Sequence, residues 1–188
     1  MVDFSRFPIA AAIRTDKDFS TALRSDVEVI FLLQSNIMTI NQCIKEIHGV
    51  GKKAFVHVDF AEGLGKDRFG INFLAKQGVD GVLTTRTNIV KAAKDAGMIT
   101  VQRFFIVDSH SVDTAVESIK QSRPDIIEMM PGIVTKKIAE FSAKVQMPII
   151  AGGLVEELSE VQEALKAGAT AVSTGNSLLW SKDIDLQG

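Results

Sequence analysis

Residues 148–175 read PIIAGGLVEELSEVQEALKAGATAVSTG, and this stretch predicts a strand, a helix and a second strand in succession. The two apolar runs, 148–151 and 169–174, have few charged positions, as expected for strands that are covered on both faces. Between them, 155–167 repeats apolar residues at helical spacing, and Gly168 is typical of a helix end. This unit therefore predicts parallel strands joined by a helix on the outside.

The same alternation runs along the whole chain of 188 residues. Further strands are predicted at 8–13, 27–33, 53–59, 80–84, 98–103 and 125–130. Helical spacing recurs in the isoleucine stripe of 37–47, in 109–122 and in 133–145, and glycines follow several of these segments. Eight strands that alternate with helices predict an α/β fold, a compact single-domain (β/α)8 TIM barrel spanning residues 1–188.

The alternative is a doubly wound open sheet. The chain is shorter than the roughly 200–250 residues of most such barrels, which counts mildly against a barrel. An open sheet, however, normally carries a glycine-rich turn after its first strand, and Ala12-Ile13-Arg14-Thr15 contains no glycine. We therefore favour the barrel.

The composition, with 46% hydrophobic and 23% charged residues, is that of a globular protein and excludes disorder. No apolar run approaches the roughly 18 residues of a membrane span, and the beginning MVDFSRFP does not have the pattern of a signal peptide. A single cysteine, Cys43, cannot form an internal disulfide, so we expect a cytoplasmic protein. The net charge of −2 gives no overall basic surface for nucleic acid.

Two glycine-containing strand ends predict a phosphate site. Barrels often bind phosphate with the loops after strands seven and eight, where glycine allows backbone N–H groups to approach an anion. Here these loops contain Gly152-Gly153 and Thr174-Gly175-Asn176. These glycines could also serve only to form tight turns. Because glycines occur in both of the loops that barrels use for phosphate, we favour a phosphate site.

Acidic and histidine side chains are predicted at the same end. His57 and Asp59 alternate with valines, so both should face the barrel mouth, and Glu128 has a similar position on strand six. A polar cluster that only caps the core is the alternative to a ligand site. The pattern does not fit zinc, whereas a hard cation such as Mg²⁺ on Asp59, Glu62 or Glu128 stays open.

Arginines lie at or beside three strand ends, and arginine matches a phosphate bidentately. They are Arg14, Arg86 and Arg103. No lysine occupies such an end, which disfavours a Schiff-base aldolase. Cys43 lies on the apolar side of a helix and is expected in the core rather than as a nucleophile.

Several segments together resemble the glycerol uptake operon antiterminator regulatory proteins, the GlpP family. They are FPIAAAIR, HVDFAEGLGKDRFG, VLTTRTN, QRFFIVDS, PDIIEMMPG, PIIAGG and GATAVSTGNSLLW, and they extend from Phe7 to Trp180. The resemblance implies a compact barrel that senses glycerol 3-phosphate and acts on the leader mRNA of glycerol operons to prevent premature transcription termination. It implies no catalytic residue, no metal and no cofactor. The ligand site that it implies consists of His57, Asp59, Arg86, Arg103, Glu128, Gly152, Gly153 and Gly175. A serine expected near position 175 is glycine here.

The sequence leaves three questions open. It contains no recognisable RNA-binding module, and its basic residues are scattered, so the RNA surface is not located. A homo-oligomer also stays open, because Trp180 could lie in the core or in a dimer interface. Finally, the same carboxylates and glycines would suit a barrel phosphohydrolase or phosphodiesterase acting on a glycerol phosphate ester, or a metabolite-binding protein whose partner is another protein.

Overall fold

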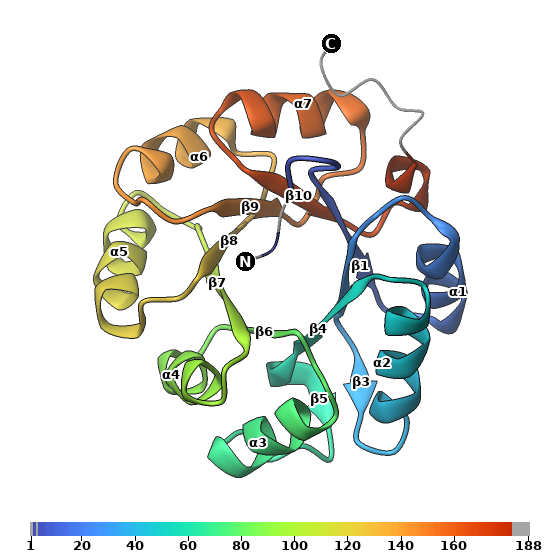
Figure 1. Cartoon of the computed structure of the whole chain (residues 1–188). Coiled ribbons are helices and arrows are strands. Elements are labelled where there is room, and N and C mark those ends of the chain that lie inside the picture. Colours follow the sequence, from blue (N-terminus) through green and yellow to red (C-terminus); the bar gives the residue numbers. More distant parts are fainter. Residues whose placement is uncertain (1, 3, 182–188) are drawn as a thin grey trace.

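The computed structural model describes Val2 and residues 4–181, and they form a closed barrel of eight parallel strands (Figure 1). Each strand pairs with the next long strand along the chain, and the last one pairs with the first. The strands are β1 (Ile9–Ile13), β2 (Val29–Leu32), β4 (Lys53–His57), β6 (Gly81–Thr84), β7 (Ile99–Phe105), β8 (Ile126–Met130), β9 (Ile149–Gly152) and β10 (Ala171–Thr174). The predicted (β/α)8 barrel is therefore confirmed.

Seven α-helices surround the barrel in the described part of the chain (Figure 1). They are α1 (Asp16–Arg24), α2 (Ile40–Gly49), α3 (Arg68–Lys76), α4 (Thr87–Asp95), α5 (Ser111–Ser122), α6 (Thr135–Ser142) and α7 (Leu158–Lys166). After β10, the short 3-10 helix η2 (Ser177–Trp180) stands in the place of an eighth helix. Short helices and this replacement explain how the barrel closes with so few residues.

The apolar residues divide between two cores, as the alternation of strand side chains requires. The larger core lies between the strands and the helices and includes Ile44, Leu74 and Phe141. The smaller core fills the barrel itself with residues such as Phe31 and Phe55. A Cβ at Gly81 would lie 2.2 Å from Cε1 of Phe55, so this glycine makes room for the ring.

Most element boundaries agree with the prediction, and the differences are local. Ile37 was expected on the buried stripe of a helix, but it is exposed in the loop before α2. That loop contains β3 (Ser35–Asn36), which pairs with β5 (Ala61–Glu62) in a two-stranded sheet that sequence reasoning missed. Strand β4 ends at His57, because the 3-10 helix η1 (Val58–Phe60) follows it at once.

Trp180 belongs to the core of its own chain. Its side chain is fully buried, and its Nε1–H donates a 3.1 Å hydrogen bond to the carbonyl oxygen of Thr174. The carbonyl of Trp180 in turn accepts from the N–H of Asp26. The interpretation of this residue as part of a dimer interface is therefore wrong.

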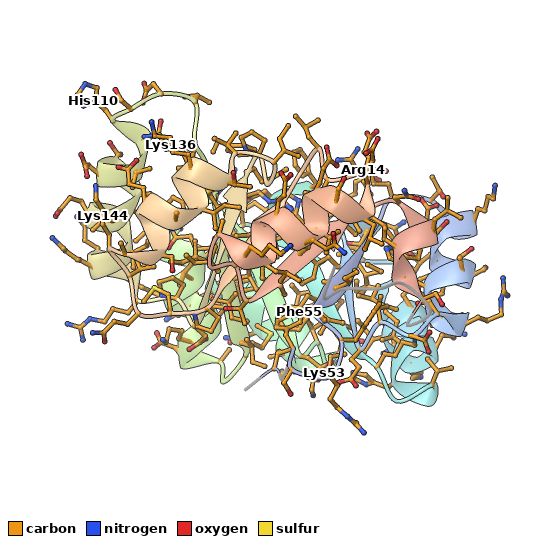
Figure 2. The ribbon with its side chains drawn as sticks, turned by 90° about the horizontal axis from the view of Figure 1, so that it is seen from above. Arg14, Lys53, Phe55, His110, Lys136 and Lys144 are labelled. Carbon is orange, nitrogen blue, oxygen red and sulfur yellow. The ribbon has the colours of Figure 1, made fainter. Side chains whose placement is uncertain are left out.

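The carboxyl ends of the strands form one end of the barrel, here called the mouth. In Figure 2, Arg14, Lys136 and His110 lie at the mouth, Lys53 lies at the opposite end, and Phe55 lies between them. The predicted site residues lie in the last three residues of strands or after them, and Arg103 and Glu128 are two residues before the ends of β7 and β8. Within the described residues, no helix combines the length and the apolar character needed to cross a membrane.

Candidate functional site

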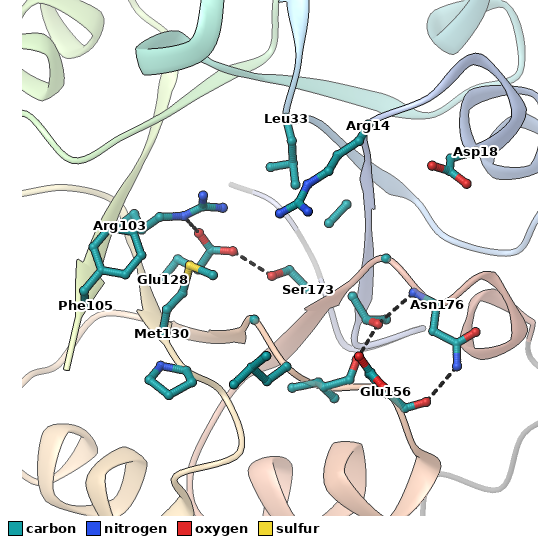
Figure 3. A pocket seen from close by; sticks show the side chains of 17 residues that line it. Arg14, Asp18, Leu33, Arg103, Phe105, Glu128, Met130, Glu156, Ser173 and Asn176 are labelled. Atoms are coloured by element: carbon teal, nitrogen blue, oxygen red, sulfur yellow. Dashed lines mark hydrogen bonds and ion pairs between the residues drawn. The ribbon is translucent and has the colours of Figure 1, made fainter. Parts of the chain in front are cut away.

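A cavity of about 680 Å³ opens at the mouth of the barrel (Figure 3). Its size is within the range of ligand pockets, and its position is where barrel sites occur. Residues from the ends of β1, β7, β8, β9 and β10 contribute its walls. Among them are Arg14, Asp18, Arg103, Phe105, Glu128, Met130, Gly153, Leu154, Ser173, Gly175 and Asn176.

A buried hydrogen-bonded group forms the floor of this cavity. The Nε–H of Arg103 donates to Oε2 of Glu128 at 2.5 Å, and the Ser173 hydroxyl donates to Oε1 at 2.6 Å. All three side chains are buried. Both carboxylate oxygens of Glu128 are therefore satisfied within the protein, which a buried charge requires.

Gly152 has a different role from the predicted contact with phosphate. A Cβ at this position would lie 2.5 Å from the Ser173 hydroxyl and 2.6 Å from Oε1 of Glu128. The absence of a side chain is what allows Ser173 and Glu128 to meet in front of strand β9. Gly152 is not among the residues that line the cavity.

Two guanidinium groups converge on the cavity from opposite sides (Figure 3). Arg103 comes from β7, and Arg14 comes from the end of β1. Among the residues that the structure describes, Arg14 has no acidic partner within 4 Å, while Arg103 uses Nε for Glu128. The arrangement provides two cations for an anionic group, one of them fixed by a buried carboxylate.

The loops after β9 and β10 form a third wall, where a phosphate was predicted. They are tied together, since the Thr174 hydroxyl donates to the Val155 carbonyl at 2.6 Å and the Asn176 amide donates to the Glu156 carbonyl at 2.7 Å. Gly153 has φ +75°, a conformation that favours glycine, and it lines the cavity together with Gly175. At Gly175 a Cβ would meet only the Ala12 carbonyl at 3.5 Å, so a serine would fit there.

The other three predicted residues gather in a neighbouring cluster and do not line the cavity. Asp59 is at its centre and accepts hydrogen bonds from the Thr84 hydroxyl and from the N–H and hydroxyl of Thr85. Nε of Arg86 lies 3.4 Å from Oδ1 of Asp59, and Nε2 of His57 lies 3.7 Å from Oδ2. Burial opposes the ionisation of Asp59, but these hydrogen bonds outweigh it and lower its pKa.

The expectation that His57 and Asp59 share one strand face is therefore wrong. The chain leaves strand geometry after His57 and forms the 3-10 helix η1, which carries Asp59 towards the end of β6. Asp59 and Glu128 consequently belong to two separate clusters, each with protein partners for its oxygens. Among residues 2 and 4–181, no group of three or more histidine, cysteine or acidic side chains could hold a metal ion.

His57, in the cluster around Asp59, is only 2% exposed. Neither ring nitrogen has a hydrogen-bond partner, although the ring packs edge-on against Phe60 with centroids 4.8 Å apart. Burial, reinforced by the positive charge of Arg103, lowers the pKa of His57 to about 4 against the opposing effect of Asp59. The imidazole is therefore neutral at pH 7.

The predicted site residues thus divide into two groups. Arg103, Glu128, Gly153 and Gly175 line the cavity, Gly152 shapes it from behind, and His57, Asp59 and Arg86 form the adjacent cluster. Sequence reasoning named Arg14 as a strand end but left it out of the implied site, and it left out Ser173 and Asn176 as well. Ser173 could have been found, because it shares the inward face of β10 with Ala171.

Comparisons with known proteins agree on one family. A family model described as glycerol-3-phosphate responsive antiterminator matches residues 9–180. A crystal structure of a glycerol uptake operon antiterminator regulatory protein from Listeria monocytogenes is 33% identical, with a TM-score of 0.90 over 95% of this chain and 97% of that one. A related protein from Thermotoga maritima is 35% identical, with a TM-score of 0.82 over 92% and 96% of the two chains. The uncharacterized protein YgcP of Escherichia coli K12 is 37% identical over 93% of this chain and 92% of its own length.

Proposed function

Because the chain belongs to the family of glycerol-3-phosphate responsive antiterminators, we propose that it binds glycerol 3-phosphate at the mouth of its barrel. In the bound state it acts on the leader mRNA of glycerol-utilisation genes and prevents premature termination. The observation that carries the ligand assignment is the meeting of two guanidinium groups, a buried carboxylate and two tied loops in one cavity.

In this proposal the phosphate lies against the loops that contain Gly153 and Gly175, with Arg14 as its cationic partner. The glycerol hydroxyl groups lie towards Arg103 and Glu128. Of the neighbouring cluster, His57 lies near enough to Arg103 for its positive charge to lower the pKa of the imidazole.

Thermal unfolding with added ligand tests this assignment. Glycerol 3-phosphate should raise Tm by mass action, whereas glycerol without a phosphate should raise it far less. Arg14→Ala should reduce the shift, and Arg24→Ala, at the other end of the same helix–strand unit, should not. No shift in the unaltered protein would contradict the proposed ligand, and an unchanged shift in Arg14→Ala would place the anion elsewhere.

Gly153→Asp is a poor variant for this purpose. A Cβ there would lie 2.4 Å from Cε of Met130, and the positive φ would strain any side chain. A lost ligand response could then reflect a damaged loop rather than repulsion between the carboxylate and the phosphate.

We propose a regulator rather than an enzyme. A barrel phosphohydrolase acting on a glycerol phosphate ester would need its carboxylates free for a metal or for proton transfer. The oxygens of Asp59 and Glu128 are instead occupied by threonines, arginines and Ser173. Incubation of glycerol 3-phosphate with the protein and Mg²⁺ should release no inorganic phosphate. Release that disappears in Asp59→Asn would establish the hydrolase.

We also propose a cytoplasmic location, since the implied ligand and mRNA are both found there. The effector is glycerol 3-phosphate, and neither a cofactor nor Mg²⁺ has a role in the proposal. A homo-oligomer remains an expectation that sedimentation or light scattering would test.

A further inference from the structure

Exposed apolar side chains are concentrated at the mouth of the barrel. Among the described residues, eleven large hydrophobic side chains are exposed, and all except Val50 follow the carboxyl end of a strand. The ten are Ile37, Met38, Phe60, Phe69, Phe105, Val107, Ile133, Val134, Leu154 and Leu178. Scattered exposed apolar residues are ordinary, but their concentration around one rim indicates a binding surface.

The three phenylalanines in this set lie in one part of the rim. Phe60 follows β4, Phe69 is in the first turn of α3, and Phe105 ends β7; their exposed fractions are 65%, 68% and 56%. Strands β4, β6 and β7 are neighbours in the barrel. We call this part, together with its cations Lys66, Arg68 and Arg86, the aromatic sector.

Among the cations of the aromatic sector, Arg68 has no acidic partner in the described residues, whereas Arg86 is directed to Asp59 and Lys66 donates to the Ala61 carbonyl. The Arg68 guanidinium lies 4.9 Å from the centre of the Phe69 ring, and the Arg86 side chain is 52% exposed. Two of the acids are occupied: Asp59 by its threonines, and Asp67 by the N–H groups of Phe69 and Gly70. Glu62 has no ion-pair partner among the described residues, and both Glu62 and Asp67 are exposed.

The opposite part of the rim has the reverse character. Five acidic residues lie at the starts of α1 and α7, namely Asp16, Asp18, Glu156, Glu157 and Glu160. No aromatic side chain is exposed in that part of the described structure. Aromatic rings are therefore exposed on one side of the rim, whereas carboxylates outnumber cations on the other side, which also carries Arg14 and Lys17.

From this combination we propose that the aromatic sector binds single-stranded RNA. The inference rests on the proposed function, which requires RNA but does not locate its site. Exposed rings provide stacking platforms for unpaired bases, and neighbouring guanidinium groups contact the backbone phosphates. A duplex would not use the rings, because its bases are stacked on each other.

The position of the aromatic sector connects it to the ligand cavity. Phe105 lines the cavity beside Arg103, and the Phe60 ring packs on His57. RNA on this sector would therefore contact Phe105, a wall of the ligand cavity, and Phe60, which packs on His57. This placement explains how a small metabolite could change RNA affinity without a second domain.

Binding of a labelled transcript tests the proposal, using the leader of the glycerol-uptake operon from the same genome. Phe69→Ala and Arg68→Ala should each weaken binding about fivefold or more, with glycerol 3-phosphate present. Arg68→Ala should also lower the slope of log affinity against log salt by about 0.7, and Phe69→Ala should leave that slope unchanged. The matched control is Lys45→Ala with Val50→Ala, a cation and an exposed apolar residue on α2 and just beyond it.

Each variant is also heated with glycerol 3-phosphate, and an unchanged ligand shift shows that it is folded. If the original protein binds RNA and both sector variants bind it equally well, the inference is overturned but the proposed function is not. No RNA binding by the original protein would overturn the inference together with the proposed function. A dimer that dissociates in Phe69→Ala without a change in RNA affinity would instead assign the sector to a second copy of the chain.

Discussion

The Ser173 hydroxyl donates a 2.6 Å hydrogen bond to Oε1 of Glu128, across a gap that exists because residue 152 has no side chain. The other oxygen of Glu128 accepts from Arg103. One glycine therefore determines whether three buried polar groups on β7, β8 and β10 can satisfy each other. The position of the Arg103 guanidinium at the floor of the cavity depends on this contact.

Gly152→Ala should destabilise the protein and abolish its response to glycerol 3-phosphate. The added methyl group would lie 2.5–2.6 Å from Ser173 and Glu128, and overpacking of this kind costs about 1–3 kcal/mol. Urea unfolding measures the loss. Gly175→Ala is the matched control, because its Cβ has an ordinary 3.5 Å contact, and its stability should change little. Equal stability of both variants would contradict this account of Gly152.

Glu128→Gln should cost more stability than Ser173→Ala. The first change leaves the buried Arg103 without its carboxylate, for which about 3–5 kcal/mol is typical. The second removes one hydrogen bond to a charged group, about 1.5–3 kcal/mol. Chemical unfolding of both variants gives the order. A reversed order would mean that Arg103 reaches another acidic partner when Glu128 is neutral.

His57 should make stability depend on pH between about 4 and 6.5. In the unfolded chain the imidazole takes up a proton near pH 6.5, whereas in the folded protein its pKa is about 4. The unfolded state therefore binds more protons in this window, and the free energy of unfolding falls as the pH decreases. The loss attributable to His57 approaches about 3 kcal/mol at the lower end.

Urea unfolding at pH 7 and pH 4.5 checks this effect. His57→Gln should remove most of the difference, while His110→Gln, at an exposed position, should keep it. The acidic residues with lowered pKa, such as Asp59 and Asp125, lose their contribution at lower pH. The same pH dependence in His57→Gln would show that another group is responsible.

Glycerol 3-phosphate and leader RNA should strengthen each other's binding by the same factor. Reciprocity is a thermodynamic requirement for two sites that share a conformational equilibrium, and about 5- to 150-fold is typical. Titration of each partner with and without saturating amounts of the other measures both factors. Equal RNA affinity with and without the metabolite would refute gating by this ligand.

A conformational change that couples glycerol 3-phosphate binding to RNA binding must involve two loops, the one after β4 and the one before α2. From the sequence alone, residues 60–66, a loop at the mouth that contains Gly63 and Gly65, are the candidate for such a movement. The β3–β5 pairing ties this segment to the loop before α2, and Lys66 donates a hydrogen bond to the Ala61 carbonyl. A Cβ at Gly70 would lie 1.9 Å from the Gly65 carbonyl, so the same segment also packs directly on α3. Hydrogen exchange should therefore report both loops changing together when ligand binds.

The architecture, and the end of the barrel that carries the site, follow from local patterns in the sequence. Apolar periodicity is a local property, since each strand and helix must present its own apolar face to a neighbour. The eight barrel strands, four of the helices and the glycine-containing ends after β9 and β10 were therefore predictable within a few residues, whereas β3 and β5 were missed. The family resemblance could also be recognised from the sequence, because its motifs extend over nearly the whole chain.

Which strand-end residues share a cavity depends on the folded arrangement of distant segments. One turn of 3-10 helix after His57 moves Asp59 to the end of β6, and no periodicity in the sequence signals that turn. The convergence of Arg14 and Arg103 depends on the closure of the barrel, which brings β1 next to β10. The role of Gly152 depends on two side chains from other strands. Contacts between distant segments are set by packing and closure, and local sequence patterns do not encode them.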